Sequence, residues 1–311
     1  MTAFNVTASN WPIFSFIGIP GLEVAQIWIF IPFCLLYLVA LVGNVLLLIL
    51  VKAEKSLHEP QFYFLAMLAY TDLGLSLSTI PSVLAIFWFD IHHVGLDACL
   101  TQMFFIHTLS SVESGVLVAM AFDRLVAICE PLNYTRILTH YTVACLSGAA
   151  LIRGVTLMTP LPFFLRIFPF CGANILSHSY CYYPDVLNLA CGDVTFSSAY
   201  GLVFVLCTFA VDVVFILVSY MKILGTVMKL GSQDRNWRSL CTVLVFYMPL
   251  ISLAVLHCYS RDTPPILYTT MSNAYLLMTP QLNPLVYSLK SRQIQAALCK
   301  QFLVPCVTAG K

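Results

Sequence analysis

Seven long apolar runs constrain the fold of this chain more than any other feature of its sequence. A helix needs about 20 mostly apolar residues to cross the hydrocarbon core of a membrane. Only 9% of the 311 residues are charged and 60% are hydrophobic, whereas soluble domains carry roughly 25% charged residues. We therefore expect an all-α, membrane-embedded bundle of seven transmembrane helices. The runs cover residues 27–51, 60–88, 97–128, 141–163, 196–228, 239–259 and 266–288.

Lysine and arginine are concentrated in alternate hydrophilic stretches, as is typical of cytoplasmic loops. These stretches and the C-terminal segment carry Lys52, Lys55, Arg136, Lys229, Arg235, Arg238, Lys290, Arg292, Lys300 and Lys311, and the stretches between them carry Arg166 and Arg261. We therefore expect a multi-pass protein of the plasma membrane with its N-terminus outside. Residues 1–26 would be extracellular, 27–290 would form the transmembrane domain, and 291–311 would be a cytoplasmic tail. The net charge of +1 gives no indication of nucleic-acid binding.

Two short segments outside the apolar runs are also informative. Residues 291–303 place Ile294, Ala297 and Leu298 on roughly one face, which predicts a short helix in the membrane interface. The triplet from Asn5 to Thr7 fits the acceptor pattern for N-glycosylation, and it lies on the predicted outer side.

The third apolar run ends in the stretch MAFDRLVAIC, residues 120–129, which contains Asp123 and Arg124. Charges inside or at the edge of a membrane span are costly and usually carry function. Together with the PLNY stretch that ends at Tyr134, this segment resembles the third-helix signature of the olfactory receptors. These are rhodopsin-like G-protein-coupled receptors.

The resemblance extends over about residues 12–300. Its other motifs are Gly43-Asn44, LAYTD ending at Asp72, and NPLVY from Asn283 to Tyr287. The stretches PGLE (20–23), SHSYC (177–181) and FYMPLI (246–251) suggest the class I, or fish-like, branch. The resemblance implies an odorant-binding receptor that activates a stimulatory olfactory G protein and raises cAMP, and nothing in the sequence suggests an enzyme. It also implies the activation residues Asp123, Arg124, Asn283, Pro284 and Tyr287.

Four cysteines, Cys99, Cys171, Cys181 and Cys191, map to the predicted outer side, where disulfides persist. Four cysteines allow three pairings. The resemblance implies the pairs Cys99–Cys181 and Cys171–Cys191. A zinc site is the alternative, although the spacing of these residues is poor for a compact four-cysteine cluster.

Besides Asp97 and Asp123 near the ends of the third run, the apolar runs contain the carboxylates Asp72, Glu113 and Asp212. Unpaired ionised groups there would cost several kcal/mol, so Asp72 and Glu113 should face the bundle interior. By resemblance this is the sodium-site region of rhodopsin-like receptors, and the alternative is a protonated, hydrogen-bonded pair. No other cofactor is expected. The sequence gives no firm role to Asp212.

The ligand pocket is expected among the outer halves of spans three, five, six and seven. A pocket is mainly apolar with a few placed polar groups. The candidate contacts to a small volatile or short-chain organic odorant are His107, Ser110, Ser111, Tyr247, His257, Cys258 and Tyr275. For each of them the alternative is packing or hydrogen bonding between helices.

Several positions depart from the family pattern. Leu125 replaces the tyrosine of the usual D-R-Y, and Glu130 precedes Pro131. Cys258 stands where several class I receptors carry an arginine. Before Pro249, about eight to ten residues of the family's inner sixth helix are missing. A receptor variant that does not signal, or signals poorly, is therefore an alternative. A channel or transporter is less favoured, because the sequence contains neither repeated half-chains nor rows of charge along several spans.

Overall fold

A computed structural model describes residues 12–16, 26–171, 174–176, 178–229 and 291–302. Five of the seven expected spans fall within these residues, and the spans predicted at 239–259 and 266–288 lie outside them. The spanning segments are α1 (Gln26–Ala53), α2 (Pro60–Phe87), α3 (Leu96–Cys129), α5 (His140–Met158) continued by α6 (Pro160–Ile167), and α8 (Thr195–Val205) continued by η3 (Leu206–Ala210) and α9 (Val211–Lys229).

The described spans begin and end close to the predicted limits. Four of them are long and apolar enough to cross a membrane, namely Cys34–Ala53, Pro60–Phe87, His140–Ile167 and Thr195–Thr226. Large apolar side chains such as Leu35, Leu77 and Val214 are exposed on their outer surfaces, which fits a bundle solvated by lipid. Short connecting helices are η1 (Lys55–Leu57), η2 (Pro131–Asn133), α4 (Tyr134–Ile137) and α7 (Tyr183–Asn188).

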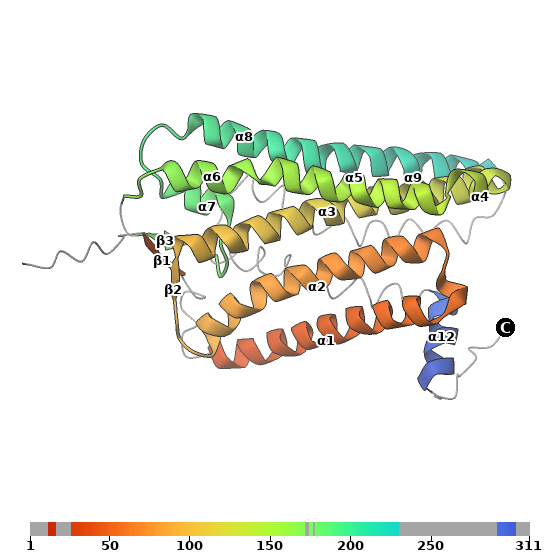
Figure 1. Ribbon diagram of the computed structural model, residues 1–311, viewed down its shortest axis with the longest axis horizontal. Coiled ribbons are helices and arrows are strands. Elements are labelled where there is room, and N and C mark those ends of the chain that lie inside the picture. The colour runs from red at the N-terminus through yellow and green to blue at the C-terminus, as the bar shows by residue number, and fades with distance from the viewer. Residues whose placement is uncertain (1–11, 17–25, 172–173, 177, 230–290, 303–311) are drawn as a thin grey trace, which may run out of the picture.

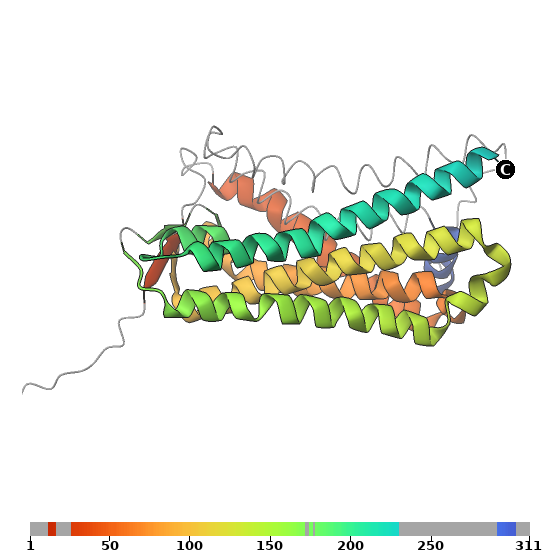
Figure 2. The same cartoon turned by 90° about the horizontal axis from the view of Figure 1, so that it is seen from above.

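The central helix of the described bundle is α3, which packs against α2, α5 and α9. Figure 1 shows α3 between α2 on one side and α5 and α9 on the other, and Figure 2 shows it between α5 and α9. One apolar cluster lies at the outer end, around Met103 and Leu165. A second lies at the inner end, around Phe64 and Leu68. Because α3 runs through both, its side chains can connect the two ends of the bundle.

The predicted tail helix is present as α12 (Arg292–Phe302). Ile294 and Ala297 are buried in the inner cluster, and the Lys300 Nζ lies 3.0 Å from a Glu54 carboxylate oxygen at the start of the first inner loop. The predicted apolar face of this helix therefore packs on the bundle, beside α1 and η1 (Figure 1).

A small sheet at the outer end was not predicted. It consists of β1 (Ile13–Phe16), β2 (His93–Gly95) and β3 (Ile175–Leu176), in the order β2-β1-β3. β1 pairs antiparallel to β2 and parallel to β3. Strands of two to four residues are too short to show a period-2 pattern, and their partners are far apart in sequence, so the sequence carried little signal for them.

Candidate functional site

Two disulfides fix the outer loop between α5–α6 and α8. Cys99 near the start of α3 is bonded to Cys181, with 5.4 Å between their Cα atoms. Cys171 is bonded to Cys191, with 5.8 Å between Cα atoms. These are the two pairings that the resemblance implied. They hold the loop against the outer end of α3.

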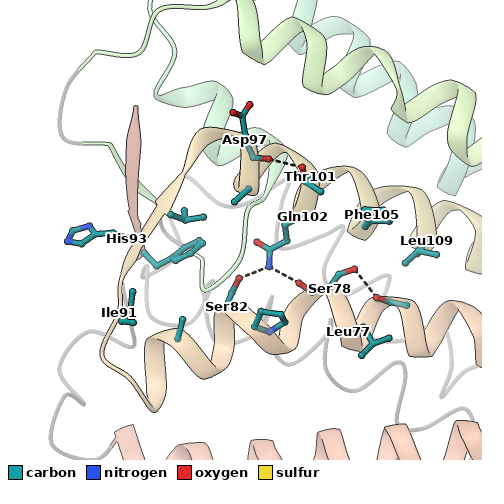
Figure 3. A pocket seen from close by; sticks show the side chains of 16 residues that line it. Leu77, Ser78, Ser82, Ile91, His93, Asp97, Thr101, Gln102, Phe105 and Leu109 are labelled. Atoms are coloured by element: carbon teal, nitrogen blue, oxygen red, sulfur yellow. Dashed lines mark hydrogen bonds between the residues drawn. The ribbon is translucent and has the colours of Figure 1, made fainter. Parts of the chain in front are cut away.

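Gln102 of α3 adds a polar connection to the same loop. Its Nε2 donates to the Ser78 carbonyl (2.9 Å) and to the Ser82 Oγ (2.6 Å) on α2, as Figure 3 shows. Its Oε1 accepts a hydrogen bond from the Cys181 backbone N–H at 3.0 Å. Sequence reasoning missed Gln102, although an amide near the outer end of a central apolar helix is the kind of residue that joins helices in lipid.

The predicted ligand contact His107 lies directly beneath the loop. The Tyr183 backbone N–H points at the His107 Nε2, 3.4 Å away. The Tyr182 ring lies 5.6 Å from the imidazole, and the Phe204 ring of α8 lies 6.3 Å from it, measured between centroids. Tyr183 is anchored in turn, since its hydroxyl donates to the Ser197 carbonyl at 2.8 Å. The loop residues Tyr182 and Tyr183 therefore join His107 at one place, which the sequence alone did not indicate.

Within that loop, His178 and Asp185 form a short contact through Nδ1 and a carboxylate oxygen. His178 is buried and also lies 5.0 Å from the Tyr182 ring between centroids. Burial raises the pKa of the Tyr183 phenol above its usual value, so that phenol stays protonated as the donor to Ser197. The loop is thus held by its own polar contacts as well as by the disulfides.

The two serines below His107 point in different directions. Ser111 is fully buried, and a Cβ placed on Gly154 of α5 would lie 3.5 Å from the Ser111 Cβ. Successive helical residues differ by about 100°. Ser111 therefore lies about 40° from His107 around α3, where it faces α5, and Ser110 lies about 60° from His107 in the opposite direction.

Asp212, which had no predicted role, lies in a polar cluster between three helices. Arg153 of α5 donates to both of its carboxylate oxygens, at 2.7 and 2.6 Å. The Ser114 Oγ of α3 donates to the same carboxylate at 2.7 Å. Sequence reasoning missed Arg153. Its signal was available, because Arg153 is a charge in the middle of the run 141–163 and Asp212 is the opposite charge inside the run 196–228.

The predicted activation pair lies at the inner end of α3. Asp123 is buried and accepts a hydrogen bond from the Tyr134 hydroxyl at 2.8 Å. The Arg124 Nε is 3.9 Å from the Asp123 carboxylate, whereas the Arg124 Nη2 donates to the Gln61 Oε1 at 2.8 Å. Burial and the neighbouring Asp123 carboxylate raise the pKa of the Tyr134 phenol, so this residue remains a donor. Within the described residues, the closest partners of the pair are thus Tyr134 and Gln61, which the sequence did not predict.

The two candidate ion-site carboxylates are both buried, Asp72 in α2 and Glu113 in α3. These two helices pack against each other. The buried Ser76 Oγ, one turn from Asp72, has no hydrogen-bond partner among the residues that the structure describes. Among the described residues, no group of three or more His, Cys, Asp or Glu side chains could hold a metal ion.

A groove of about 900 Å³ lies between α2 and α3, on the side of α3 that carries Gln102, Phe105 and Leu109. Figure 3 shows these side chains with Leu77 and Ser78 of α2. Phe105 is turned by about 160° from His107 around the helix. This groove is therefore separate from the side of α3 on which the ligand contacts were predicted.

Several predicted residues lie outside the described part of the chain. These are the ligand candidates Tyr247, His257, Cys258 and Tyr275, the activation residues Asn283, Pro284 and Tyr287, and the glycosylation candidate Asn5.

Comparison with known proteins agrees with the motifs. The family profile described as "Olfactory receptor" matches residues 33–304. Human olfactory receptor 51F2 is 46% identical over 307 residues, which covers 96% of this chain and 90% of that protein. Human olfactory receptor 51I1 is 43% identical over 292 residues, covering 92% and 93%. Human olfactory receptor 52K2 is 44% identical over 309 residues, covering 97% and 98%. The chain belongs to the olfactory receptor family and is an odorant-sensing receptor of the G-protein-coupled class, in the branch that contains human receptors 51 and 52.

Proposed function

We propose that this receptor binds a small organic odorant at the outer half of α3 and activates a stimulatory olfactory G protein, which raises cAMP. One observation carries the proposal. The same helix, Leu96–Cys129, places His107 under the outer loop and Arg124 in a hydrogen bond to α2 at the inner end. A rigid helix in contact with both ends is the element that a two-state receptor requires.

The odorant would contact His107 and Ser110, with Tyr182 and Phe204 as apolar and aromatic wall. Ser111 would act through its packing against α5. Tyr247, His257, Cys258 and Tyr275 would complete the site from the sixth and seventh spans. Among the described residues of this proposed wall there is no lysine or arginine. A neutral odorant with a hydroxyl or carbonyl group therefore suits these residues better than a carboxylate, which would need a cationic partner.

Activation would move Arg124 away from Gln61 and Asp123 and toward the G protein. The contact to Gln61 is short and the contact to Asp123 is long, so release from Gln61 would be the larger change. Asn283, Pro284 and Tyr287 in the seventh span would supply the second moving part.

A sodium ion would be held by the buried carboxylates Asp72 and Glu113. The buried Ser76 Oγ, which lacks a hydrogen-bond partner in the described part of the chain, would be an additional oxygen ligand one turn from Asp72, and oxygen ligands suit a hard cation. In that position the ion would neutralise carboxylates that are costly to bury in lipid.

We propose the plasma membrane as the site of function, with the N-terminus outside. The two disulfides support this orientation, because both lie at the end of the bundle that carries β1, and disulfides persist in oxidising compartments. Asn5 would then be available for glycosylation.

The function is tested by a cAMP assay on cells in which surface receptor is confirmed by antibody. The odorants are straight-chain primary alcohols, aldehydes and carboxylic acids from butyl to decyl. Dose-dependent cAMP that is abolished by Arg124→Ala at equal surface level would support the proposal. Odorant-induced thermal stabilisation without any cAMP would instead favour the second candidate, a receptor that binds but does not signal. The short polar approach to Pro249 in the sequence favours that candidate.

A further inference from the structure

The cluster around Asp212 is the most extensive polar contact between spans in the described residues that the proposed function does not use. The Arg153 guanidinium meets the carboxylate through two parallel hydrogen bonds of 2.7 and 2.6 Å. The same guanidinium donates to the Ser111 carbonyl at 3.2 Å, and the Ser114 hydroxyl donates to the carboxylate at 2.7 Å. α3, α5 and α9 are therefore joined at one point.

The pair is costly to break at this place. Asp212 is only 4% exposed and the Arg153 side chain 28%. Removing one partner of a buried pair leaves an uncompensated charge, and in lipid no water replaces it. The packing of α5 against α3 also leaves room for the arginine. A Cβ on Gly115 of α3 would lie 3.1 Å from the Arg153 Nη2 and 2.8 Å from the Ala150 Cβ.

The helix just outside Asp212 has an unusual backbone. Leu206–Ala210 forms a π-helical segment between α8 and α9. In a regular α-helix, residues eight positions apart differ by about 80°. A π-turn contains one residue more than an α-helical turn, so it removes about one residue's rotation from that angular difference. Phe204 and Asp212 can therefore share one face of the fifth span, and both are buried, at 4% exposure each.

The two ends of this π-segment meet α3 at two places. On the outer side, Phe204 lies beside His107, with 6.3 Å between ring centroids. On the inner side, Asp212 is held by Arg153 and Ser114. A π-segment can relax to a regular helix only if the residues on one side of it rotate. The ion pair opposes that rotation from the inner side.

We infer that Arg153 and Asp212 are positioning residues for the odorant site, because their ion pair holds the rotation of the fifth span that places Phe204 beside His107. Neither residue touches the odorant in this arrangement. The inference rests on the proposed odorant site at His107 and not on coupling to a G protein. A negative cAMP assay would therefore not contradict it, and the experiment below tests it separately.

The test measures whether positions 107 and 204 remain adjacent. The reporter is the full chain with His107→Cys, Phe204→Cys and Cys207→Ala, expressed in cells, from which surface molecules are isolated. Dibromobimane is the probe, since it becomes strongly fluorescent only when two thiols have displaced its two bromides. Chains with only one of the added cysteines give the background. The reporter should fluoresce well above them, and failure to do so would overturn the placement of Phe204.

Into this reporter are introduced Asp212→Glu, Asp212→Asn and the double change Arg153→Met with Asp212→Leu. The Glu variant keeps the pair and should retain the fluorescence per surface molecule. The Asn variant should lose most of it. The double variant contains no unpaired charge, so it should recover surface level while its fluorescence stays severalfold below the reporter's. If the Asp212→Asn variant fails to reach the surface, the fluorescence of the double variant decides whether the inference holds.

The matched control is the ion pair between Arg166 and Asp97, at 3.5 Å, which is exposed at the outer end. Arg166→Ala in the reporter should leave the fluorescence per surface molecule unchanged. If the double variant cross-links as well as the reporter, the pair serves only to fold the protein and the inference is wrong. The inference is also wrong if Arg166→Ala lowers the fluorescence per surface molecule as much as Asp212→Asn does.

Discussion

The polar side chains of α3 serve different purposes according to their direction and their depth along the helix. Gln102 connects α2 to the outer loop, and Ser114 and Ser111 meet the Arg153–Asp212 pair on the side of α5 and α9. His107 lies between the loop and Phe204. In an apolar environment each of these groups is worth more when it is paired, so substitutions should have effects that depend on the partner lost.

We expect His107→Ala to weaken odorant potency several-fold while surface level is retained. A good hydrogen bond contributes about 0.5–1.5 kcal/mol net, and 1.4 kcal/mol corresponds to about tenfold. Potency is measured by odorant-dependent cAMP or by thermal stabilisation over the alcohol, aldehyde and acid panel. Thr101→Ala is the control, because Thr101 is exposed on α3 and its hydroxyl donates to the Asp97 carbonyl of the same helix. Equal potency of the His107 variant and the control would refute the contact.

Tyr134→Phe should lower the thermal stability of the detergent-solubilised receptor. The change removes the hydroxyl that donates to the buried Asp123 carboxylate at 2.8 Å, and hydrogen bonds to charged groups contribute about 1.5–3 kcal/mol. Tyr141→Phe removes an exposed hydroxyl on α5 and serves as the control. A melting temperature of the Tyr134 variant that matches the control would show that Arg124 alone satisfies Asp123.

Among the elements, the α3–α5 contact is close enough to be sensitive to a single methyl group. A Cβ on Gly115 would lie 2.8 Å from the Ala150 Cβ, whereas a Cβ on Gly148 of α5 would meet nothing within 4 Å. Small residues let helix backbones approach closely in membranes. This contact brings Arg153 within reach of α9.

Gly115→Ala is therefore expected to destabilise the receptor, and overpacking typically costs about 1–3 kcal/mol. Gly148→Ala should be neutral or stabilising, since alanine is favoured over glycine in a helix by up to about 1 kcal/mol. Surface level and melting temperature of the two variants give the comparison. If Gly115→Ala has the same surface level and melting temperature as Gly148→Ala, α3 and α5 can move apart to accept the methyl group, and the close contact does not limit stability.

The disulfide from α3 to the outer loop provides a second element-scale prediction. Cys99→Ser should lose surface expression, because a disulfide typically contributes about 2–4 kcal/mol and this one joins residues 82 positions apart. Cys145→Ser is the control, since Cys145 is an exposed free cysteine on α5. Peptide mapping that found Cys99 as a free thiol in surface receptor would contradict the pairing.

For the molecule as a whole, the sequence predicted the described spans well and the contacts between them poorly. The limits of α1, α2 and α3 follow from runs of apolar residues, which are local signals. The sheet around Ile13–Phe16 and the position of Tyr182 against His107 depend on segments far apart in sequence. The opposite charges of Arg153 and Asp212 were a sequence signal, but their contact with each other is visible only in the packed helices. Periodicity cannot reveal such pairings, because they arise only when the helices pack.

The last prediction concerns the sixth span, whose residues lie outside the described part of the structure. In the sequence, the polar stretch Gln233–Ser239 ends only ten residues before Pro249. Ten helical residues cover about 15 Å, roughly half of the ~30 Å hydrocarbon thickness. Receptors of this class signal by swinging the inner end of that helix, so a short lever should give weak or no cAMP even in receptor that reaches the surface and is stabilised by an odorant. The measurement compares basal and odorant-evoked cAMP between this chain and one with a family-like inner segment inserted after Leu240. Full-strength signalling from the unmodified chain would show that the loop itself continues the helix.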